Sequence, residues 1–265
     1  MPWVFRGLRN GVLTTRWPKG SDEYYDHFPA AVQVIGGPDT AVSPAVFDAA
    51  AACPTDAISP DPRPRLDRGR CIVCGRCVDL APDWFAWERG CATAELMRPA
   101  LVVGDAEEND EALAQLRASL ARRVRRLRRS VHIRHVDTGS NGSDEWEIQA
   151  LTNPVYDVHR LGIFFTASPR HADILLVTGI GASGMVQPLR RTLDAMPAPT
   201  VVIAVGADAS SGGIIGGGYI GGTGISDLVP VDVWVPGAPA SPFSVLHGIL
   251  LALGRVPLPR SGRAK

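Results

Sequence analysis

The chain has 265 residues, of which 45% are apolar and 20% charged, so one large or two small folded domains are expected and wholesale disorder is excluded. Lys plus Arg and Asp plus Glu each number 27, a balance that disfavours nucleic acid as a partner. The best apolar run, Phe243 to Leu253, is too short for a spanning helix, which needs about 18 residues. The N-terminus lacks the apolar core of a secretory signal, which favours a reducing compartment and free thiols.

All cysteines fall in one part of the chain. The five lie between Cys53 and Cys91, and no residue after Cys91 is a cysteine. This asymmetry predicts two modules. The expected divisions are an N-terminal extension packed on a neighbour (1–42), a small ligand-stapled domain with Pro-rich loops (43–105), a basic linker helix (106–130), a second domain (131–256) and a tail (257–265).

The spacing of the first four cysteines is typical of a ferredoxin-type site. Cys71, Cys74 and Cys77 follow the pattern C-x₂-C-x₂-C, and Cys53-Pro54 supplies the end of an earlier run. In such paired runs the last cysteine of one run ligates the cluster of the other. The four cysteines are therefore predicted to hold one [4Fe–4S] cluster. The expected ligand positions of a second cluster in this domain carry other residues, namely Ser43, Val46, Ala49 and Ala81.

Zinc is the alternative for any set of four cysteines. Zinc sites usually gather their ligands as two separated C-x₂₋₄-C pairs, whereas this chain crowds three cysteines together, which favours the cluster. Cys91 stands outside the pattern and is expected to be a small buried residue.

Residues Glu107 to Arg129 predict an amphipathic helix. Leucine and valine recur at steps of three and four, acids occupy its start, and six arginines occupy its end, in agreement with the helix dipole. The expected function is a solvated linker docked along one apolar stripe. A basic surface for anionic lipid or an acidic partner is the alternative. The predicted stripe is Leu113, Leu116, Leu120, Val124 and Leu127.

The remaining sequence alternates buried strands with helices. ADILLVTG, TVVIAVGAD and VDVWVPG are apolar runs of the buried parallel-strand type, and MVQPLRRTLDAM between the first two has helical spacing. A final helix, SPFSVLHGILLALG, begins after Ser241, which is a suitable cap. The predicted fold class is α/β, a small ferredoxin-like α+β cluster domain followed by a doubly wound, flavodoxin-like parallel sheet.

Two known families share these features. The cysteine motif, with the preceding FRGLRNGVLTTRWP, resembles the ferredoxin-like subunit of formate hydrogenlyase and related energy-converting hydrogenases. SVHIRHVDTGSNG, ALTNPVYDVHRLGIFFTASPRHADILLVTG and LVPVDVWVPGAP resemble the small subunit of NiFe hydrogenases and the B subunit of NADH:quinone oxidoreductase. The resemblance implies a fused iron–sulfur subunit that binds a large subunit and membrane-arm subunits, peripheral on the cytoplasmic face of the cell membrane.

The second resemblance also implies a cluster that this chain has lost. Members of that family hold a [4Fe–4S] cluster on four cysteines in this domain, and here the matching positions carry Asn141 to Ser143, Asp208 and Ala238. Serine, aspartate and alanine together do not replace four thiolates. The resemblance therefore predicts no second cluster, and either electron transfer through the remaining cluster or a purely structural role for it.

A nucleotide-binding domain is the competing prediction. Gly179-x-Gly181-x-x-Gly184 lies between a predicted strand and a predicted helix, and Asp208 follows the next strand, as in a dinucleotide fingerprint. An NAD(P) or flavin nucleotide would use the free backbone N–H groups of this turn. The later match Gly216-x-Gly218-x-x-Gly221 lacks a following helix and is expected to be a loop.

Several polar residues are expected to make structural contacts. His132, Arg134, His135 and Asp137 approach the lost cluster position and are predicted to form interface or core hydrogen bonds. Arg170, His171 and Asp173 are predicted to act at a subunit interface. No Ser-His-Asp nucleophile is indicated, because no G-x-S-x-G motif is present.

Overall fold

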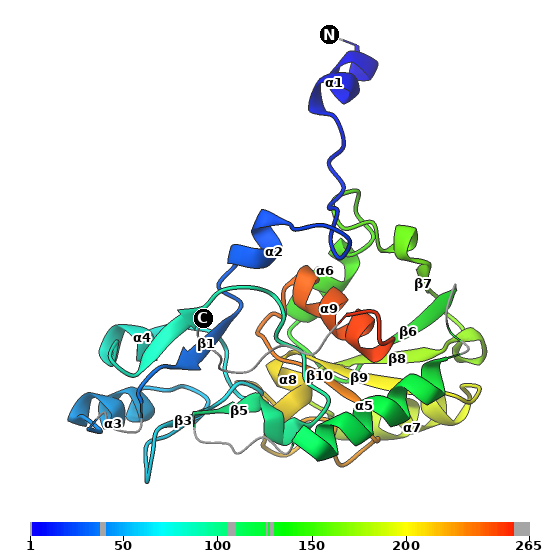
Figure 1. The fold of residues 1–265 in the computed structure, drawn as a ribbon. Helices are drawn as coiled ribbons and strands as arrows, with labels where there is room; N and C mark the ends of the chain where they lie inside the picture. Colours follow the sequence, from blue (N-terminus) through cyan, green and yellow to red (C-terminus); the bar gives the residue numbers. More distant parts are fainter. Residues whose placement is uncertain (1, 38–40, 105–109, 126, 128–129, 257–265) are drawn as a thin grey trace.

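The buried apolar runs of the C-terminal half form one parallel sheet. The computed structural model describes residues 2–37, 41–104, 110–125, 127 and 130–256 (Figure 1). The five strands pair in the order β10-β9-β8-β6-β7, and all four pairings are parallel. Counted along the chain this order is 2-1-3-4-5, that of flavodoxin-like sheets, so the expected α/β fold of this half is confirmed. The strands are β6 (Val131–Asp137), β7 (Ile163–Phe165), β8 (Ile174–Thr178), β9 (Val201–Val205) and β10 (Val233–Val235).

Helices cover both faces of this sheet, because alternate residues of each strand point to opposite sides. Ile174 and Leu176 of β8 belong to one core, and Leu175 and Val177 to the other. Apolar residues of α5, α6 and α9 join the first core, and those of α7 and α8 the second. These helices are α5 (Asp110–Val124), α6 (Ser143–Ala150), α7 (Val186–Asp194), α8 (Gly206–Ser211) and α9 (Pro242–Ala252).

The last helix, α9, is buried along its whole length, which explains its apolar sequence. Ser241 caps it as expected, since its side chain accepts a hydrogen bond from the N–H of Ser244 at 3.2 Å. Short 3₁₀ helices complete the connections at Arg98–Leu101, Val158–Leu161, Pro169–His171 and Ser183–Met185. Among the described residues, no helix combines the length and apolar character needed to cross a bilayer.

The cysteine-bearing part is built from short strands and helices around a small core. Strand β1 pairs antiparallel with β4, and β3 pairs antiparallel with both β2 and β5. Strand β1 thus lies inside this unit, although its residues belong to the stretch expected to be an extension. The elements are β1 (Ala31–Val34), α3 (Pro44–Ala51), β2 (Ile58–Ser59), β3 (Arg65–Asp67), α4 (Arg76–Leu80), β4 (Phe85–Glu88) and β5 (Val102–Val103).

The two parts contact each other through a few specific interactions. Glu95 forms an isolated antiparallel bridge with Trp234 of β10. Arg98 makes a two-pronged ion pair with Asp67, at 2.7 and 2.8 Å, and also donates to the backbone oxygen of Ser210 at 3.3 Å. Asp67 belongs to the cysteine-bearing unit and Ser210 to α8, so this arginine joins the two units.

The basic helix α5 docks on the sheet domain, as the linker prediction requires. Leu120 and Val124 are buried in the core shared with α9, whereas Leu116, expected in the same stripe, is 43% exposed. Arg123 turns inward, donating to both carboxylate oxygens of Asp232 at 2.6 and 2.8 Å. The predicted helix extends to residues 105–109, 126, 128 and 129, which lie outside the described residues.

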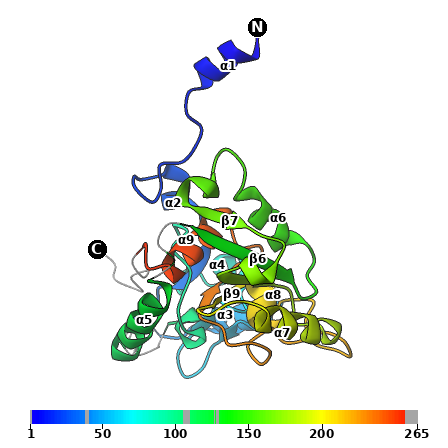
Figure 2. The ribbon, with the colours of Figure 1, turned by 90° about the vertical axis from the view of Figure 1, so that its right-hand side faces the viewer.

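The N-terminal residues differ from the expected packed extension. Helix α2 (Glu23–His27) is capped by Asp22, and the aromatic ring of Tyr25 stacks on Trp17 over the start of α9. Helix α1 (Trp3–Asn10), in contrast, has no buried residue. Figures 1 and 2 both show it standing clear of the rest of the chain, so this segment packs on the rest of the chain only from about Thr14 onward.

Candidate functional site

Two turns bring the four candidate ligands together. The first follows α3 and carries Cys53, whose sulfur accepts a hydrogen bond from the N–H of Ala57 at 3.3 Å. The second runs from β3 to α4 and carries Cys71, Cys74 and Cys77. Within the second turn, the N–H of Val73 donates to the sulfur of Cys71 at 3.3 Å. Hydrogen bonds of this kind favour the thiolate form, which is the form that binds iron.

Backbone conformation explains why the second turn is so tight. Val73 has φ of +56° and Gly75 has φ of +79°, both in the left-handed region. A Cβ atom on Gly75 would lie 2.7 Å from the Trp87 ring, so only glycine fits there. These two residues reverse the chain between Cys71 and Cys77, and the three cysteines therefore face the same space.

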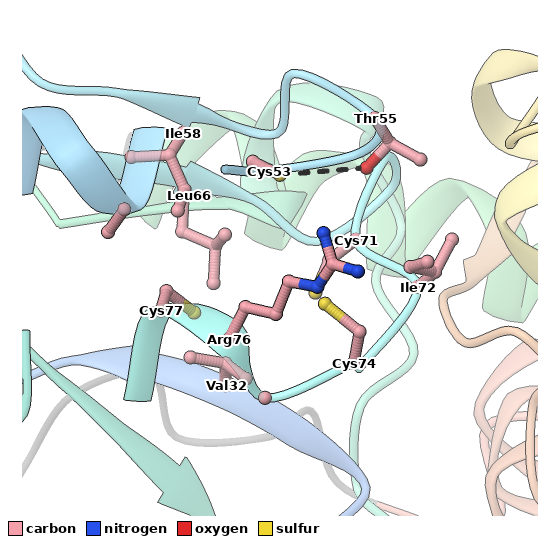
Figure 3. Close-up of a pocket in the computed structure, with 12 residues that line it drawn as sticks. Val32, Cys53, Thr55, Ile58, Leu66, Cys71, Ile72, Cys74, Arg76 and Cys77 are labelled. Carbon is pink, nitrogen blue, oxygen red and sulfur yellow. Dashed lines mark hydrogen bonds between the residues drawn. The ribbon is translucent and has the colours of Figure 1, made fainter. Parts of the chain in front are cut away.

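All four cysteines line one cavity, shown in Figure 3. Its interior holds about 330 Å³ of space free of atoms, including the part open to solvent. Cys77 is buried, Cys53 and Cys71 are half-buried and Cys74 is exposed. Among the described residues, no three His, Cys, Asp or Glu side chains converge as the ligands of a single metal ion would. Apolar side chains complete the wall, namely Val32, Ala49, Ile58, Leu66 and Ile72.

Burial keeps the cysteine thiols protonated unless a cation compensates them. Removal from water raises the pKa of Cys71 to about 12 and that of Cys77 to about 11. Neighbouring cysteines raise both values further, because a second thiolate would repel the first. A bound metal group would displace these protons, so the donor set suits a highly charged metal centre.

A single arginine lines the same cavity. Arg76, the first residue of α4, donates from Nη1 to the backbone oxygen of Ala52 at 3.3 Å. Ala52 ends α3 directly before Cys53, so this side chain links the two cysteine-bearing turns. Its positive charge lies beside a site that would hold several thiolates, where it favours negative charge.

The resemblance places a second candidate site at the carboxyl edge of the parallel sheet, and a buried carboxyl group lies there. Asp144 in the first turn of α6 is 2% exposed, and its Oδ1 accepts a hydrogen bond from the N–H of Ala240 at 2.9 Å. A Cβ atom on Gly206, at the start of α8, would lie 2.0 Å from Asp144 Oδ2. This carboxyl group therefore joins the loops that follow β6, β9 and β10.

The carboxyl edge also concentrates negative charge. Burial raises the pKa of Asp144 to about 7, and the nearby carboxylates of Asp208, Glu145 and Glu147 raise it further, while the Ala240 hydrogen bond lowers it. The pKa of Asp208 is raised as well, chiefly by burial. Oxygen ligands of this kind do not take the place of thiolates around an iron–sulfur cluster.

Ser143, which stands where the resembling family has a cysteine, makes a local hydrogen bond. The Ser143 hydroxyl bonds the exposed Asn141 side chain at 2.6 Å, and the next residue, Asp144, points inward instead. The sequence analysis missed Asp144, because acidic residues are common in the first turn of any helix. Only the contacts with Gly206 and Ala240 distinguish this carboxyl group from an ordinary surface acid.

In the glycine turn after β8, three backbone N–H groups already have hydrogen-bond partners within the chain. The N–H of Gly181 donates to the Thr138 hydroxyl at 3.1 Å, and that of Ala182 to the Thr138 backbone oxygen at 2.8 Å. The N–H of Ser183 donates to the oxygen of Ile220 at 3.0 Å. Nucleotide binding at a helix N-terminus needs such groups free, so this arrangement disfavours the dinucleotide interpretation.

Close packing explains two of the three fingerprint glycines, whereas a Cβ on Gly184 would meet no atom within 4 Å. A Cβ on Gly179 would lie 2.8 Å from the Gly139 backbone, and one on Gly181 would lie 2.5 Å from the oxygen of Gly224. Both have positive φ, +82° and +72°. The turn therefore needs glycine at these positions so that three loops can approach one another closely. The fingerprint pattern by itself does not distinguish this packing role from nucleotide binding.

The two histidines of β6 lie at different ends of the strand, His135 toward the carboxyl edge and His132 near the opposite end. His135 contacts the Thr178 hydroxyl at 3.0 Å, and burial lowers its pKa, which favours the neutral ring. His132 lies 3.8 Å from Asp173 and stacks on Phe164.

Cys91 is fully buried, and its sulfur lies 3.5 Å from the hydroxyl of Ser241. The expectation that Cys91 is a small buried residue is confirmed.

Comparisons with known proteins match the sheet domain of this chain to a known family. The model of the family described as NADH ubiquinone oxidoreductase, 20 Kd subunit, matches residues 142–252. All five cysteines precede this match. The chain is 41% identical over 145 residues to formate hydrogenlyase subunit 7 of Escherichia coli, covering 55% of this chain and 56% of that protein.

Other relatives are covered more completely. The probable membrane-bound hydrogenase subunit mbhJ of Pyrococcus furiosus is 35% identical over 148 residues, which cover 56% of this chain and 89% of that protein. Among solved structures, the membrane-bound sulfane sulfur reductase, an archaeal respiratory membrane complex, has a chain 27% identical with a TM-score of 0.43, over 49% of this chain and 75% of that chain. On its sequence, the chain belongs to the family of the NADH ubiquinone oxidoreductase 20 Kd subunit.

Proposed function

We propose that this chain is an iron–sulfur electron-transfer or accessory subunit of a membrane-associated oxidoreductase complex of the complex I-like or energy-converting hydrogenase-like type. It carries one [4Fe–4S] cluster on Cys53, Cys71, Cys74 and Cys77. The observation that carries the proposal is the single cavity lined by all four thiols. When bound, such a cluster accepts and releases one electron at a time.

The chemistry of the cavity supports a cluster over zinc. Four thiols line one cavity, three of them from a single crowded C-x₂-C-x₂-C run, and in a cube each thiolate binds a different iron. Zinc gathers its ligands tightly around one ion. The N–H groups of Ala57 and Val73 hold two of the sulfurs, and Arg76 adds a positive charge beside them.

The surrounding residues suit a ferredoxin-like domain. Residues 43–105 form its main part, and β1 pairs with β4 to extend it. The pairing of Arg68 with Glu88 and the bond from Arg68 to the oxygen of Val32 at 3.1 Å hold these strands together.

The sheet domain has a binding role in this proposal. The partners are a hydrogenase-like or complex I-like large subunit and membrane-arm subunits, with the chain peripheral on the inner face of the cell membrane. The names of two relatives support this, since one is a formate hydrogenlyase subunit and the other a probable membrane-bound hydrogenase subunit. The carboxyl edge, where Asp144 and Asp208 lie, would hold no second cluster.

Iron and acid-labile sulfide, measured per chain after anaerobic purification, test the proposal together with an electron paramagnetic resonance spectrum of the reduced protein. About four irons and one cubane signal are expected. About eight irons would contradict the single cluster, and zinc or no metal would contradict the cluster itself. Reduction of the cluster during turnover of the native complex separates electron transfer from a purely structural staple.

A further inference from the structure

The N-terminal helix presents an apolar face that nothing in the described chain covers. Within this helix Trp3 is 83% exposed, Leu8 75% and Phe5 59%, although such side chains are usually buried. Figures 1 and 2 show α1 projecting from the molecule in both views. An exposed cluster of large apolar side chains marks a surface that binds something.

The arrangement of side chains around α1 is strongly amphipathic. At 100° per residue, Trp3, Val4 and Leu8 fall on one side of the helix and Arg6 and Arg9 on the other. Phe5 falls between Leu8 and Arg9. Tryptophan beside aliphatic residues, with arginine on the polar face, is the composition of helices that lie in the membrane interface.

The charge of this segment has one sign. Between residues 2 and 21 the charged side chains are Arg6, Arg9, Arg16 and Lys19, and the first acid is Asp22. The chain as a whole is neutral, so this positive charge is local. Anionic lipid headgroups attract such a segment by about 1 kcal/mol for each basic residue near the surface.

The segment is also attached to the body at a defined point. The N–H of Thr15 donates to the oxygen of Val155 at 2.8 Å, and the Thr14 hydroxyl donates to the oxygen of Pro154 at 2.7 Å. Gly11, with φ of +65°, ends the helix just before this attachment. The C-terminal end of the helix is therefore held close to the sheet domain.

We propose that α1 lies in the headgroup region of an anionic membrane, with Trp3 and Leu8 among the acyl chains and Arg6 and Arg9 on lipid phosphates. A helix of eight residues is only marginally stable in water, so an apolar surface is needed to hold it. The charge favours a lipid surface over an apolar groove on another protein, because lipid phosphates pair with both arginines. The proposal does not depend on the cluster.

Cosedimentation of the full chain with vesicles tests this binding. Vesicles of phosphatidylcholine with phosphatidylglycerol are compared with vesicles of phosphatidylcholine alone, at low and at moderate salt. The wild-type chain is expected to bind the anionic vesicles more strongly, and the double variant R6A/R9A is expected to lower the partition coefficient about 30-fold. L8D is expected to abolish binding, because it places a charge at the apolar face.

Matched controls keep the test specific. R122A/R125A removes one arginine from the end of α5 and one directly after it. W146A removes a tryptophan of α6 that is 73% exposed and is compared with W3A on α1. Neither control is expected to change vesicle binding more than twofold, in contrast to R6A/R9A and W3A. An equal loss in the controls would overturn the assignment to α1, and equal binding to neutral vesicles would overturn the role of the anionic headgroups.

Two further outcomes distinguish this proposal from the proposed function. A chain that holds about four irons but does not bind vesicles would overturn the membrane-binding helix alone. A second outcome would also overturn the membrane-binding helix. If the wild-type chain does not bind vesicles, and the α1 variants are lost from the detergent-purified complex, then α1 binds a protein and not a lipid surface. Vesicle binding by a chain without iron would support the helix and contradict the cluster.

Discussion

The two halves of this chain are stabilised in different ways. The sheet domain has two large cores, one on each face of five parallel strands, and contains no cysteine. The cysteine-bearing part has a much smaller core. Several of its buried residues are alanine or cysteine, whereas larger residues predominate in the cores of the sheet domain. Small domains of this kind usually need a metal or a disulfide to be stable.

This difference explains how one half can lack cluster ligands and keep its fold. At the carboxyl edge of the sheet, Asp144 and the backbone of Gly206 and Ala240 hold the loops together without metal. In the cysteine-bearing part, four thiols line one small cavity together with Arg76. Loss of a ligand should therefore have opposite consequences in the two halves.

The largest effect is expected from C71S. Structural metal binding contributes on the order of 10 kcal/mol or more, so removal of one ligand should lower iron to near zero and unfold the cysteine-bearing part alone. Hydrogen exchange, read separately over residues 31–103 and 131–253, measures this. C91A is the matched control, because Cys91 is buried outside the cavity. Protection of residues 31–103 in an iron-free C71S protein would mean that the small core suffices.

The next effect is expected from D144N, and it depends on pH. The folded pKa of Asp144 is about 7, against 3.8 in a model peptide, so the folded protein binds more protons than the unfolded chain between these values. The contribution of Asp144 to the free energy of unfolding is therefore greatest at low pH and falls as pH rises to about 7, by about 4 kcal/mol for three units.

D144N removes this dependence, because the amide stays neutral and can still accept from Ala240. The variant should gain stability relative to wild type as pH rises from 5 to 8. Thermal unfolding at four pH values measures the gain. S143A, which changes the adjacent side chain without a charge, serves as the control and should show no such trend. A gain that is flat with pH would mean that Asp144 stays ionised throughout.

A smaller effect is expected where the linker helix meets the sheet domain. R123A removes the paired hydrogen bonds to Asp232 and the bond to the oxygen of Thr200 at 2.5 Å. Because the Arg123 side chain is 39% exposed, the expected loss is about 1 kcal/mol in the free energy of unfolding. Urea unfolding compares it with R122A on the same helix. Equal values would show that the basic helix docks through its apolar stripe alone.

The smallest effect is expected at the cavity and concerns the cluster's reduction potential. Arg76 favours added negative charge, so R76Q should lower the midpoint potential, by about 59 mV or less. A redox titration followed by electron paramagnetic resonance measures the shift, with the exposed Arg89, outside the cavity lining, changed to glutamine as the control. An unchanged midpoint potential in R76Q would mean that Arg76 does not influence the cluster and that its hydrogen bond to the Ala52 oxygen is purely structural.

Much of the fold could be predicted from the sequence. Buried parallel strands such as β8 and β9 are continuous apolar runs, and α9 carries its own cap, so local patterns predict both. The C-x₂-C-x₂-C spacing likewise predicts a shared site for Cys71, Cys74 and Cys77, because residues so close in sequence cannot lie far apart. Strand β1 was not predicted, because its four residues are too few for a clear pattern and form a strand through pairing with β4.

The sequence by itself determined the residue types: four cysteines at cluster spacing, none in the sheet domain, and alternating apolar runs for the strands. Only the tertiary structure decided which polar groups meet. Asp144 reaches Ala240 across 96 positions of the chain, and Thr138 occupies the N–H groups of the glycine turn more than 40 positions later. Such contacts depend on the strand order of the sheet, which places the ends of distant strands side by side and which no local pattern contains.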